Sequence, residues 1–268
     1  MRLFSFFGGT SSLYFPGCTT YYKNKEGFEL YQKIFSKLGI KFKLLDKNLC
    51  SGLEALEAGY EQDARKMARK NFDKFIENNV RSIITNSPGC YKMFLQNYPQ
   101  MFPDWNIEVK NLWKLILEKL NKKHYLINHK PIIRATFHDS CYLGRYCNIY
   151  DEPRKILEAI GYEIVEMDNS REKSFCCGSC GNLPIVNEQL ANRIARERIL
   201  QAKRIKMNKM IVSSFDNYNL LKKNTGNIGV EILELSEVLA NSLGIKKSEK
   251  LKEEIEGEER ILVELENE

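Results

Sequence analysis

The feature that most constrains the fold is an internal repeat, since residues 13–127 and 132–243 follow one pattern. Each half opens with an apolar run that ends in a cysteine, at Cys18 and at Cys141. A cysteine–glycine turn, a long amphipathic stretch and another apolar run follow in both halves, with corresponding positions 126 or 127 residues apart. Chance does not readily hold an offset so nearly constant, so the pattern indicates duplication.

Short segments of strand character alternate with helical segments in both halves. This alternation predicts an α/β fold of two tandem pseudo-symmetric repeats, each a small, mostly parallel sheet covered by helices. Gly39 and Gly161 are expected to end the first helix of each repeat. We expect the repeats at residues 1–128 and 129–245, followed by a charged tail at 246–268. The expected strands are 41–46, 82–86, 163–168 and 210–213, and the expected long helices are 56–79 and 186–207.

The eight cysteines indicate metal binding more than disulfides if the protein is cytoplasmic. No run approaches the roughly 18–20 apolar residues that span a bilayer. The apolar stretch at residues 1–7 is interrupted too early for a signal peptide. We therefore expect a cytoplasmic protein without direct membrane insertion, associated with a membrane only through a partner. The net charge of +6 comes without a Lys/Arg block or a nucleic-acid-binding motif, so no nucleic-acid partner is expected.

The six motif cysteines of the two repeats are expected in turns at the ends of strands: Cys18, Cys50, Cys90, Cys141, Cys176 and Cys177. In parallel sheets, functional groups collect at the carboxyl ends of the strands. The neighbouring thiolates of Cys176 and Cys177 can face one polynuclear cluster if the backbone turns sharply, which Gly178 and Gly181 allow. Glycine-rich turns also bring backbone N–H groups to cluster sulfurs. An iron–sulfur cluster fits this arrangement, with a tetrahedral zinc site as the competing interpretation.

The sequence resembles the cysteine-rich CCG family, found in heterodisulfide reductase and in iron–sulfur subunits of glycolate, lactate and glycerol-3-phosphate oxidation. The resemblance runs from Leu13 to Asn241 and is strongest in the second repeat. The segments that carry it are HDSCYLGR at 138–145, YDEPRKIL at 150–157, VEM at 165–167 and FCCG at 175–178. Together they look most like the membrane-complex catalytic subunit of heterodisulfide reductase and its sulfite-reduction relatives.

The resemblance implies cluster ligands in both repeats, because five cysteines of each family repeat can hold a noncubane [4Fe–4S] cluster. Neither repeat of this chain has all five. The matching cysteines are Cys18, Cys50 and Cys90 in the first repeat and Cys141, Cys176 and Cys177 in the second, whereas Ser51, Ser87, Ser214 and Asn217 replace cysteines of the family pattern.

Cys180 offers a substitute ligand, three residues beyond Cys177. With Cys141 and Cys176 these residues make four thiolates, enough for one [4Fe–4S] cluster or one Cys₄ zinc. The first repeat, with three cysteines, is expected to be an incomplete site whose binding of a second cluster is left open. Cys147 matches no ligand position, and we expect it to be a buried apolar thiol.

Other polar residues are expected around the cluster. His138 and Asp139, with Gly178, would lie just outside the ligands, where His138 either donates a hydrogen bond to a cluster sulfur or pins the turn. Arg145 and Arg154 are expected in solvated ion pairs, with an anionic thiol or carboxylate substrate as the alternative.

The resemblance implies an oxidoreductase subunit, either electron-transferring or catalytic. It would connect a protein donor with a thiol/disulfide or small organic-acid redox system. The cysteine run of bacterial ferredoxins and the glycine motif of dinucleotide sites are both missing. The expected electron donor is therefore a partner protein with ferredoxin-type clusters or flavin. The alternative function is an assembly or interaction module with structural zinc or no metal.

Overall fold

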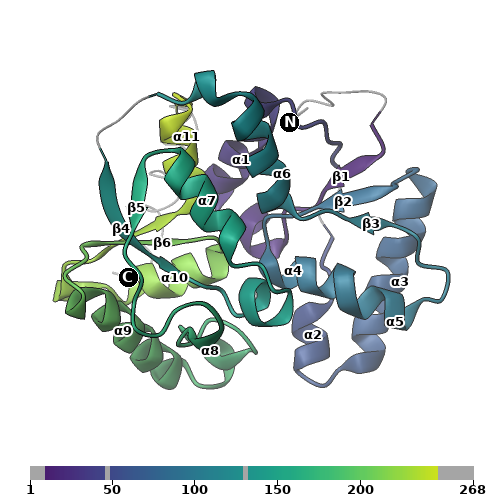
Figure 1. Ribbon diagram of the computed structural model, residues 1–268. Helices are drawn as coiled ribbons and strands as arrows, with labels where there is room; N and C mark the ends of the chain where they lie inside the picture. Colours follow the sequence, from purple (N-terminus) through teal and green to yellow (C-terminus); the bar gives the residue numbers. More distant parts are fainter. Residues whose placement is uncertain (1–9, 46–48, 129–131, 247–268) are drawn as a thin grey trace, which may run out of the picture.

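The computed structural model describes residues 10–45, 49–128 and 132–246. Its two sheets lie side by side, with helices packed around them (Figure 1). The predicted tail at 246–268 lies outside the described residues except for Lys246. The first repeat contains β1 (Ser12–Tyr14), α1 (Lys25–Leu38), α2 (Leu53–Glu57), α3 (Glu61–Glu77), β2 (Ser82–Ile84), α4 (Pro88–Lys92), α5 (Tyr98–Met101), β3 (Glu108–Val109) and α6 (Leu112–Lys122). The second contains β4 (Ile133–His138), α7 (Asp151–Ala159), β5 (Tyr162–Ile164), α8 (Leu183–Val186), α9 (Glu188–Arg204), β6 (Lys209–Val212), α10 (Phe215–Lys223), β7 (Glu231–Glu234) and α11 (Leu235–Ser242).

The two sheets share one strand order. The first runs β1-β2-β3 and the second β5-β4-β6-β7, and every strand pair among the described residues is parallel. In the first sheet, an isolated parallel bridge joins Leu13 of β1 to Lys43. Lys43 therefore occupies the place next to β1 that β5 occupies next to β4 in the second sheet. The predicted α/β fold of two tandem repeats with parallel sheets is confirmed.

Several element boundaries differ from those expected. The helix expected at 56–79 is divided into α2 and α3, because Gly59 turns the chain between them at a φ of 87°. The strand expected at 41–46 is reduced, within the described residues, to the bridge at Lys43. The helix expected at 186–207 is α9, preceded by the separate short helix α8. Gly39 ends α1 as predicted, in the left-handed conformation with a φ of 71°.

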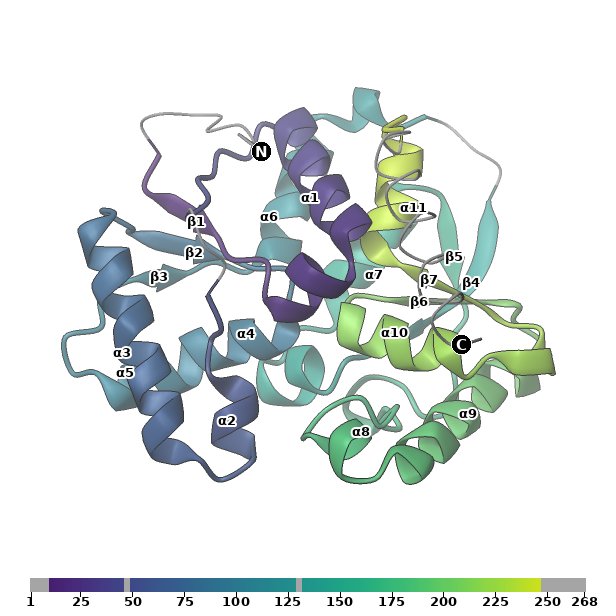
Figure 2. The same ribbon diagram turned by 180° about the vertical axis from the view of Figure 1, so that it is seen from behind.

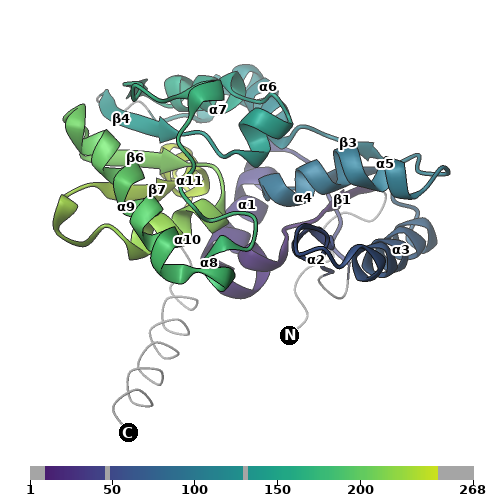
Figure 3. The ribbon, with the colours of Figure 1, turned by 90° about the horizontal axis from the view of Figure 1, so that it is seen from below.

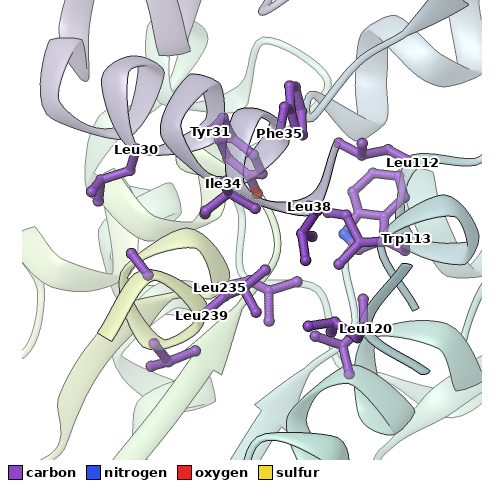
Figure 4. Packing of buried hydrophobic residues seen from close by; sticks show 14 of the residues in the cluster. Leu30, Tyr31, Ile34, Phe35, Leu38, Leu112, Trp113, Leu120, Leu235 and Leu239 are labelled. Carbon is purple, nitrogen blue, oxygen red and sulfur yellow. The ribbon is translucent and has the colours of Figure 1, made fainter. Parts of the chain in front are cut away.

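One hydrophobic core cluster contains residues from both repeats. Helices α1 and α6 of the first repeat meet α7 and α11 of the second in this cluster. Figure 4 shows Tyr31 and Leu38 of α1 close to Leu112 of α6 and Leu235 of α11. The packing is tight enough that a Cβ added at Gly27 would fall 1.9 Å from the Phe215 ring. Because this core crosses residue 128, the division into two domains there stays a prediction.

Each repeat also has a core cluster of its own. That of the first repeat is rich in aromatic side chains, among them Phe72, Phe75 and Phe94. That of the second is built mainly from alanine, methionine and aliphatic side chains behind α9. In the part of the chain that the structure describes, no helix has the length and apolar character needed to cross a membrane.

Candidate metal centre

The three cysteines of the first repeat lie beyond strands or at the start of helices. Cys18 follows β1 and begins a π-helical turn, Thr19–Lys23, while Cys50 directly precedes the turn into α2 and Cys90 lies in the first turn of α4. Cys18 donates a side-chain hydrogen bond to Cys50, which raises the pKa of Cys18 and lowers the pKa of Cys50. Cys90 is buried and donates to Ser51 Oγ at 3.3 Å. Burial raises the pKa of Cys90 to about 12.

Three cysteines of the second repeat form a chain of hydrogen bonds. Cys141 follows β4 and, like Cys18, begins a π-helical turn, Tyr142–Tyr146. Cys176 donates to Cys141, and Cys141 donates to Cys180. The bond from Cys176 lowers the pKa of Cys141, but the bond to Cys180 and burial outweigh it and raise that pKa to about 12. The structure thus brings together three of the four thiols that the sequence grouped, and their role as ligands stays a prediction.

Cys177 is buried in the core of the second repeat, where it donates to Ser179 Oγ at 3.3 Å, and Ser179 Oγ in turn lies 3.5 Å from Cys180 Sγ. The Cys177 side chain is 1% exposed, and burial raises its pKa to about 11. The Asn217 amide donates to Cys177 Sγ at 3.1 Å and to Ser179 Oγ at 2.7 Å. Asn217 stands at the position equivalent to Cys90, 127 residues further along the chain. An amide thus contacts the Cys177 thiol where the first repeat retains a cysteine.

Matching glycine turns bring backbone N–H groups to one sulfur in each repeat. Gly52 N donates to Cys50 Sγ, and Gly178 N donates to Cys176 Sγ, both at 3.4 Å. The two glycines have φ values of 88° and 86°, in the left-handed region that favours glycine. A Cβ at either position would lie 3.1 Å from a backbone oxygen of α3 or α9. Both turns therefore require glycine for two reasons, the positive φ and the lack of space for a Cβ.

A cavity of about 370 Å³ lies between the repeats. Residues of α2 line it from the first repeat, and residues of α8 and α10 line it from the second. Figures 2 and 3 show where these three helices lie in the fold. The thiols among its lining residues are Cys18, Cys50 and Cys90 of the first repeat and Cys180 of the second. The sequence did not predict that thiols of both repeats would line one cavity, because offsets within a repeat carry no information on how the repeats pack.

His138 and Asp139 serve the frame of the second repeat. Arg198 Nε donates to His138 Nδ1 at 3.1 Å, and burial followed by the Arg198 charge lowers the pKa of His138 well below its usual value. Asp139 receives two bonds from Arg154, at 2.6 and 2.9 Å. In the described residues neither side chain makes a hydrogen bond to a thiol, so their place around a cluster stays a prediction.

The expected exposure of Arg154 is wrong. Its side chain is 4% exposed and donates to Glu166 as well as Asp139, with Nε of Arg154 2.5 Å from Glu166 Oε1. This buried network holds the end of β4 against α7, and no solvated guanidinium remains for a substrate. Arg145 Nη1 donates to the Ser174 backbone oxygen at 2.7 Å. Sequence patterns could not reveal the network, because Asp139 and Glu166 lie 15 and 12 residues from Arg154.

The residues present fit an iron–sulfur cluster by the chemistry of their donors. Thiols converge from several strand ends, and glycine N–H groups point at two of the sulfurs, as cluster sulfurs require. Two buried oxygens beside the thiols, Ser140 Oγ and Asn217 Oδ1, lack a hydrogen-bond partner among the described residues. Within the same residues, no three His, Cys, Asp or Glu side chains are gathered around a point as the ligands of one metal ion would be. A cluster of several irons takes its thiolates around a larger body than a single zinc does.

Comparison with known proteins places the chain in a family. The model of the CCG cysteine-rich domain matches residues 12–95 and again residues 135–216. The chain therefore belongs to the CCG family, and the resemblance seen in its motifs is confirmed. The two matches fall one in each structural repeat.

Similar proteins are named as oxidoreductases or as a reductase subunit. The chain is 35% identical to the probable iron-sulfur-binding oxidoreductase FadF of Bacillus subtilis, over 80% of this chain and 31% of that protein. It is 32% identical to the EtfAB:quinone oxidoreductase of Syntrophomonas wolfei, over 66% and 25% of the two chains. It is 28% identical to a subunit of the dihydromethanophenazine:CoB–CoM heterodisulfide reductase of Methanosarcina barkeri, over 88% and 60%. The chain thus spans less than two thirds of the length of these relatives.

Solved structures show a more distant likeness. Picrophilus torridus aspartate racemase has a TM-score of 0.41 and 11% identity, over 90% of this chain and 97% of that one. A likeness this weak carries no argument about function.

Proposed function

We propose that this chain is the iron–sulfur subunit of a heterodisulfide-reductase-like oxidoreductase and holds at least one [4Fe–4S] cluster. The observation that carries the proposal is the hydrogen-bonded chain Cys176–Cys141–Cys180 at the strand ends of the second repeat. When bound, a cluster there supplies one-electron redox chemistry. The ligands we propose are drawn from the cysteines Cys18, Cys50, Cys90, Cys141, Cys176, Cys177 and Cys180.

The chain's own residues would act by holding and insulating the cluster. The glycine turns at Gly52 and Gly178 donate N–H groups to sulfur, which stabilises added negative charge on a reduced cluster. The Arg154 network fixes the turn that carries Cys141. Burial of Cys90 and Cys177 keeps water from their sulfurs. These features support electron transfer.

The proposed electron donor is a separate protein or domain with ferredoxin-type clusters or flavin. The names of the relatives support this, since one is an EtfAB:quinone oxidoreductase and another is a subunit of heterodisulfide reductase. The proposed electron acceptor is a thiol/disulfide or a small organic acid. We propose a cytoplasmic location, with any membrane contact made through a partner.

A second candidate function is an assembly module with zinc or no metal. Asn217 favours it, because the amide occupies a ligand position of the family and already satisfies the Cys177 thiol. Under this alternative the remaining thiols are remnants of a lost cluster. The two candidates differ in metal content, so they can be separated chemically.

Anaerobic purification followed by iron, acid-labile sulfide and zinc analysis tests the proposed function. We expect iron and sulfide in near-equal amounts and visible absorbance of a cluster. Cys141→Ser should strip much of that absorbance, because serine oxygen is a poor ligand for iron–sulfide centres. The matched control is Cys147→Ser, since Cys147 is half-buried against the shared core and burial raises its pKa to about 11. A colourless protein with stoichiometric zinc would refute the proposal, and equal loss in both variants would refute the ligand assignment.

A further inference from the structure

The cavity between the repeats contains thiols from both halves of the chain. Cys18, Cys50 and Cys90 line it from the first repeat, where the family pattern is incomplete. Cys180 lines it from the second repeat. The second-repeat thiols that match the family pattern are not among the described residues that line this cavity; they are Cys141, Cys176 and Cys177. Three thiols of the first repeat and one thiol of the second therefore line the same cavity.

The loop that carries Cys180 is attached to the first repeat. Asn182 Nδ2 donates to the Glu54 backbone oxygen of α2 at 3.0 Å. Gly181 N donates to Tyr142 Oη at 3.4 Å, and the Tyr142 side chain packs in the core cluster of the first repeat. Cys180 packs against that same cluster, as Cys141 does. Successive left-handed residues, Gly181 at a φ of 67° and Asn182 at 57°, let the loop turn there.

The surroundings of Cys180 and Cys90 coincide. The Asp216 carboxylate contributes to raising the pKa of both thiols, after burial in the case of Cys90 and after burial and the charge of Cys177 in the case of Cys180. Asp216 also lines the cavity. Cys177, in contrast, is held by Asn217 within the second-repeat core. Ser179 Oγ lies 3.3 Å from Cys177 Sγ and 3.5 Å from Cys180 Sγ, so the two thiols are neighbours, but Cys177 is not among the described residues that line the cavity.

We infer that Cys180 completes a four-thiolate iron–sulfur site with Cys18, Cys50 and Cys90, so that one cluster bridges the two repeats. This inference rests on the proposed function and changes one assignment within it, because the sequence alone grouped Cys180 with Cys141, Cys176 and Cys177. Four thiolates are the number that an ordinary [4Fe–4S] cluster takes. Cys141 contacts Cys180 and therefore lies next to the bridging site. It is not among the described residues that line the cavity.

The test measures iron and sulfide per folded chain in single and double variants. The singles are Cys50→Ser, Cys177→Ser and Cys180→Ser, and the doubles combine Cys180→Ser with each of the others. If Cys180 belongs with Cys50, the Cys50/Cys180 double loses no more iron than the Cys50 single. The Cys177/Cys180 double then loses the sum of what its two singles lose. The reverse pattern, or wild-type iron content and an unchanged electron paramagnetic resonance spectrum in Cys180→Ser, overturns the inference.

If Cys180→Ser does not fold, alkylation of the cysteines tests the inference without that variant. Cys177→Ser protein is alkylated with iodoacetamide before and after the removal of iron by a chelator, and each cysteine is followed by mass spectrometry. Cys180 should be protected by iron together with Cys18, Cys50 and Cys90. An unchanged labelling rate at Cys180 while Cys18 is protected overturns the inference. Wild-type protein without iron or sulfide overturns the proposed function itself, an outcome visible before any variant is made.

Discussion

The two repeats build the same turns but carry different donors. Gly52 and Gly178 have nearly identical φ values and reach a sulfur at the same 3.4 Å distance. At the next equivalent position the first repeat has Cys90 in α4, whereas the second has Asn217 in α10. The backbone turns are thus the same in the two repeats, whereas the side chain at a ligand position differs. Loss of a thiol at one position leaves the frame around the other thiols intact.

The repeats also differ in what stabilises their frames. Aromatic rings pack edge to face in the first repeat, with the centroids of Phe15 and Phe94 4.8 Å apart. The second repeat has a buried ion network centred on Arg154, which holds Asp139 two residues before the first cysteine of that repeat. Breaking a buried ion pair leaves a buried charge uncompensated, whereas removing part of a ring leaves only a cavity. The second repeat should therefore be the more sensitive to a single charge deletion.

The largest expected effect comes from Arg154→Met. This substitution leaves the Asp139 carboxylate, which is 3% exposed, without its ion-pair partner. It should lower the free energy of unfolding by about 3–5 kcal/mol. Urea denaturation of the metal-free protein measures the change. The control is Arg134→Met, which breaks an ion pair with Glu163 that is more than half exposed and should cost about 0–1 kcal/mol. Similar losses in the two variants would show that the buried network is not what holds this repeat.

A pH-dependent effect is expected at the junction of the repeats. Glu234 of β7 is fully buried and accepts hydrogen bonds from Ser236 and from Tyr31 of α1. Burial raises the pKa of Glu234 from 4.5 to about 7, against the opposing effect of these hydrogen bonds, while Glu237 adds to the rise. Tyr14 of β1 also faces it, and burial keeps the pKa of Tyr14 far above this range.

Because the folded state holds the Glu234 proton more tightly, stability is highest below the ordinary carboxyl pKa. It falls as the pH rises through about 7, by roughly 3 kcal/mol in all. Glu234→Gln should flatten this slope in urea denaturation at a series of pH values. Glu231→Gln, at an exposed position of the same strand, should leave the slope unchanged. A slope that survives in Glu234→Gln would assign the pH dependence to another group.

The glycine turns provide the most direct comparison of the repeats. Gly52→Ala and Gly178→Ala should each lower the free energy of unfolding by about 2–3 kcal/mol, because strain at positive φ adds to the close contact with a backbone oxygen. Gly59→Ala is the matched control: its φ is 87°, but nothing lies within 4 Å of the added Cβ. It should cost about 1 kcal/mol. The two turns are not equivalent if the stability losses of Gly52→Ala and Gly178→Ala differ from each other by as much as either differs from that of Gly59→Ala.

The sequence predicted the features that repeat along it. Nearly constant offsets revealed the duplication, Gly39 marked a helix end, and the cysteine motifs grouped Cys141, Cys176, Cys177 and Cys180, of which the structure links Cys141, Cys176 and Cys180. Local rules failed where long-range packing decides. They placed Arg154 in solvent, because neither carboxylate partner is near it in the sequence.

The packing of the repeats was equally beyond local rules. No periodicity predicts that Cys180 lines one cavity with Cys18 and Cys90, since that depends on how α1 and α6 pack against α7 and α11. The hydrogen bond from Asn217 to Cys177 was missed for a related reason. Asn217 was identified as a lost ligand, but the partner of its side chain depends on the fold.

X-ray absorption at the iron edge of anaerobically purified protein tests the central claim most directly. The account predicts iron whose nearest neighbours are sulfur, with further iron atoms just beyond them, as in a thiolate-bound cluster. Cys147→Ser should give the same spectrum. Iron bound by oxygen or nitrogen without an iron neighbour, or zinc as the sole metal, would contradict the claim that these cysteines hold an iron–sulfur cluster.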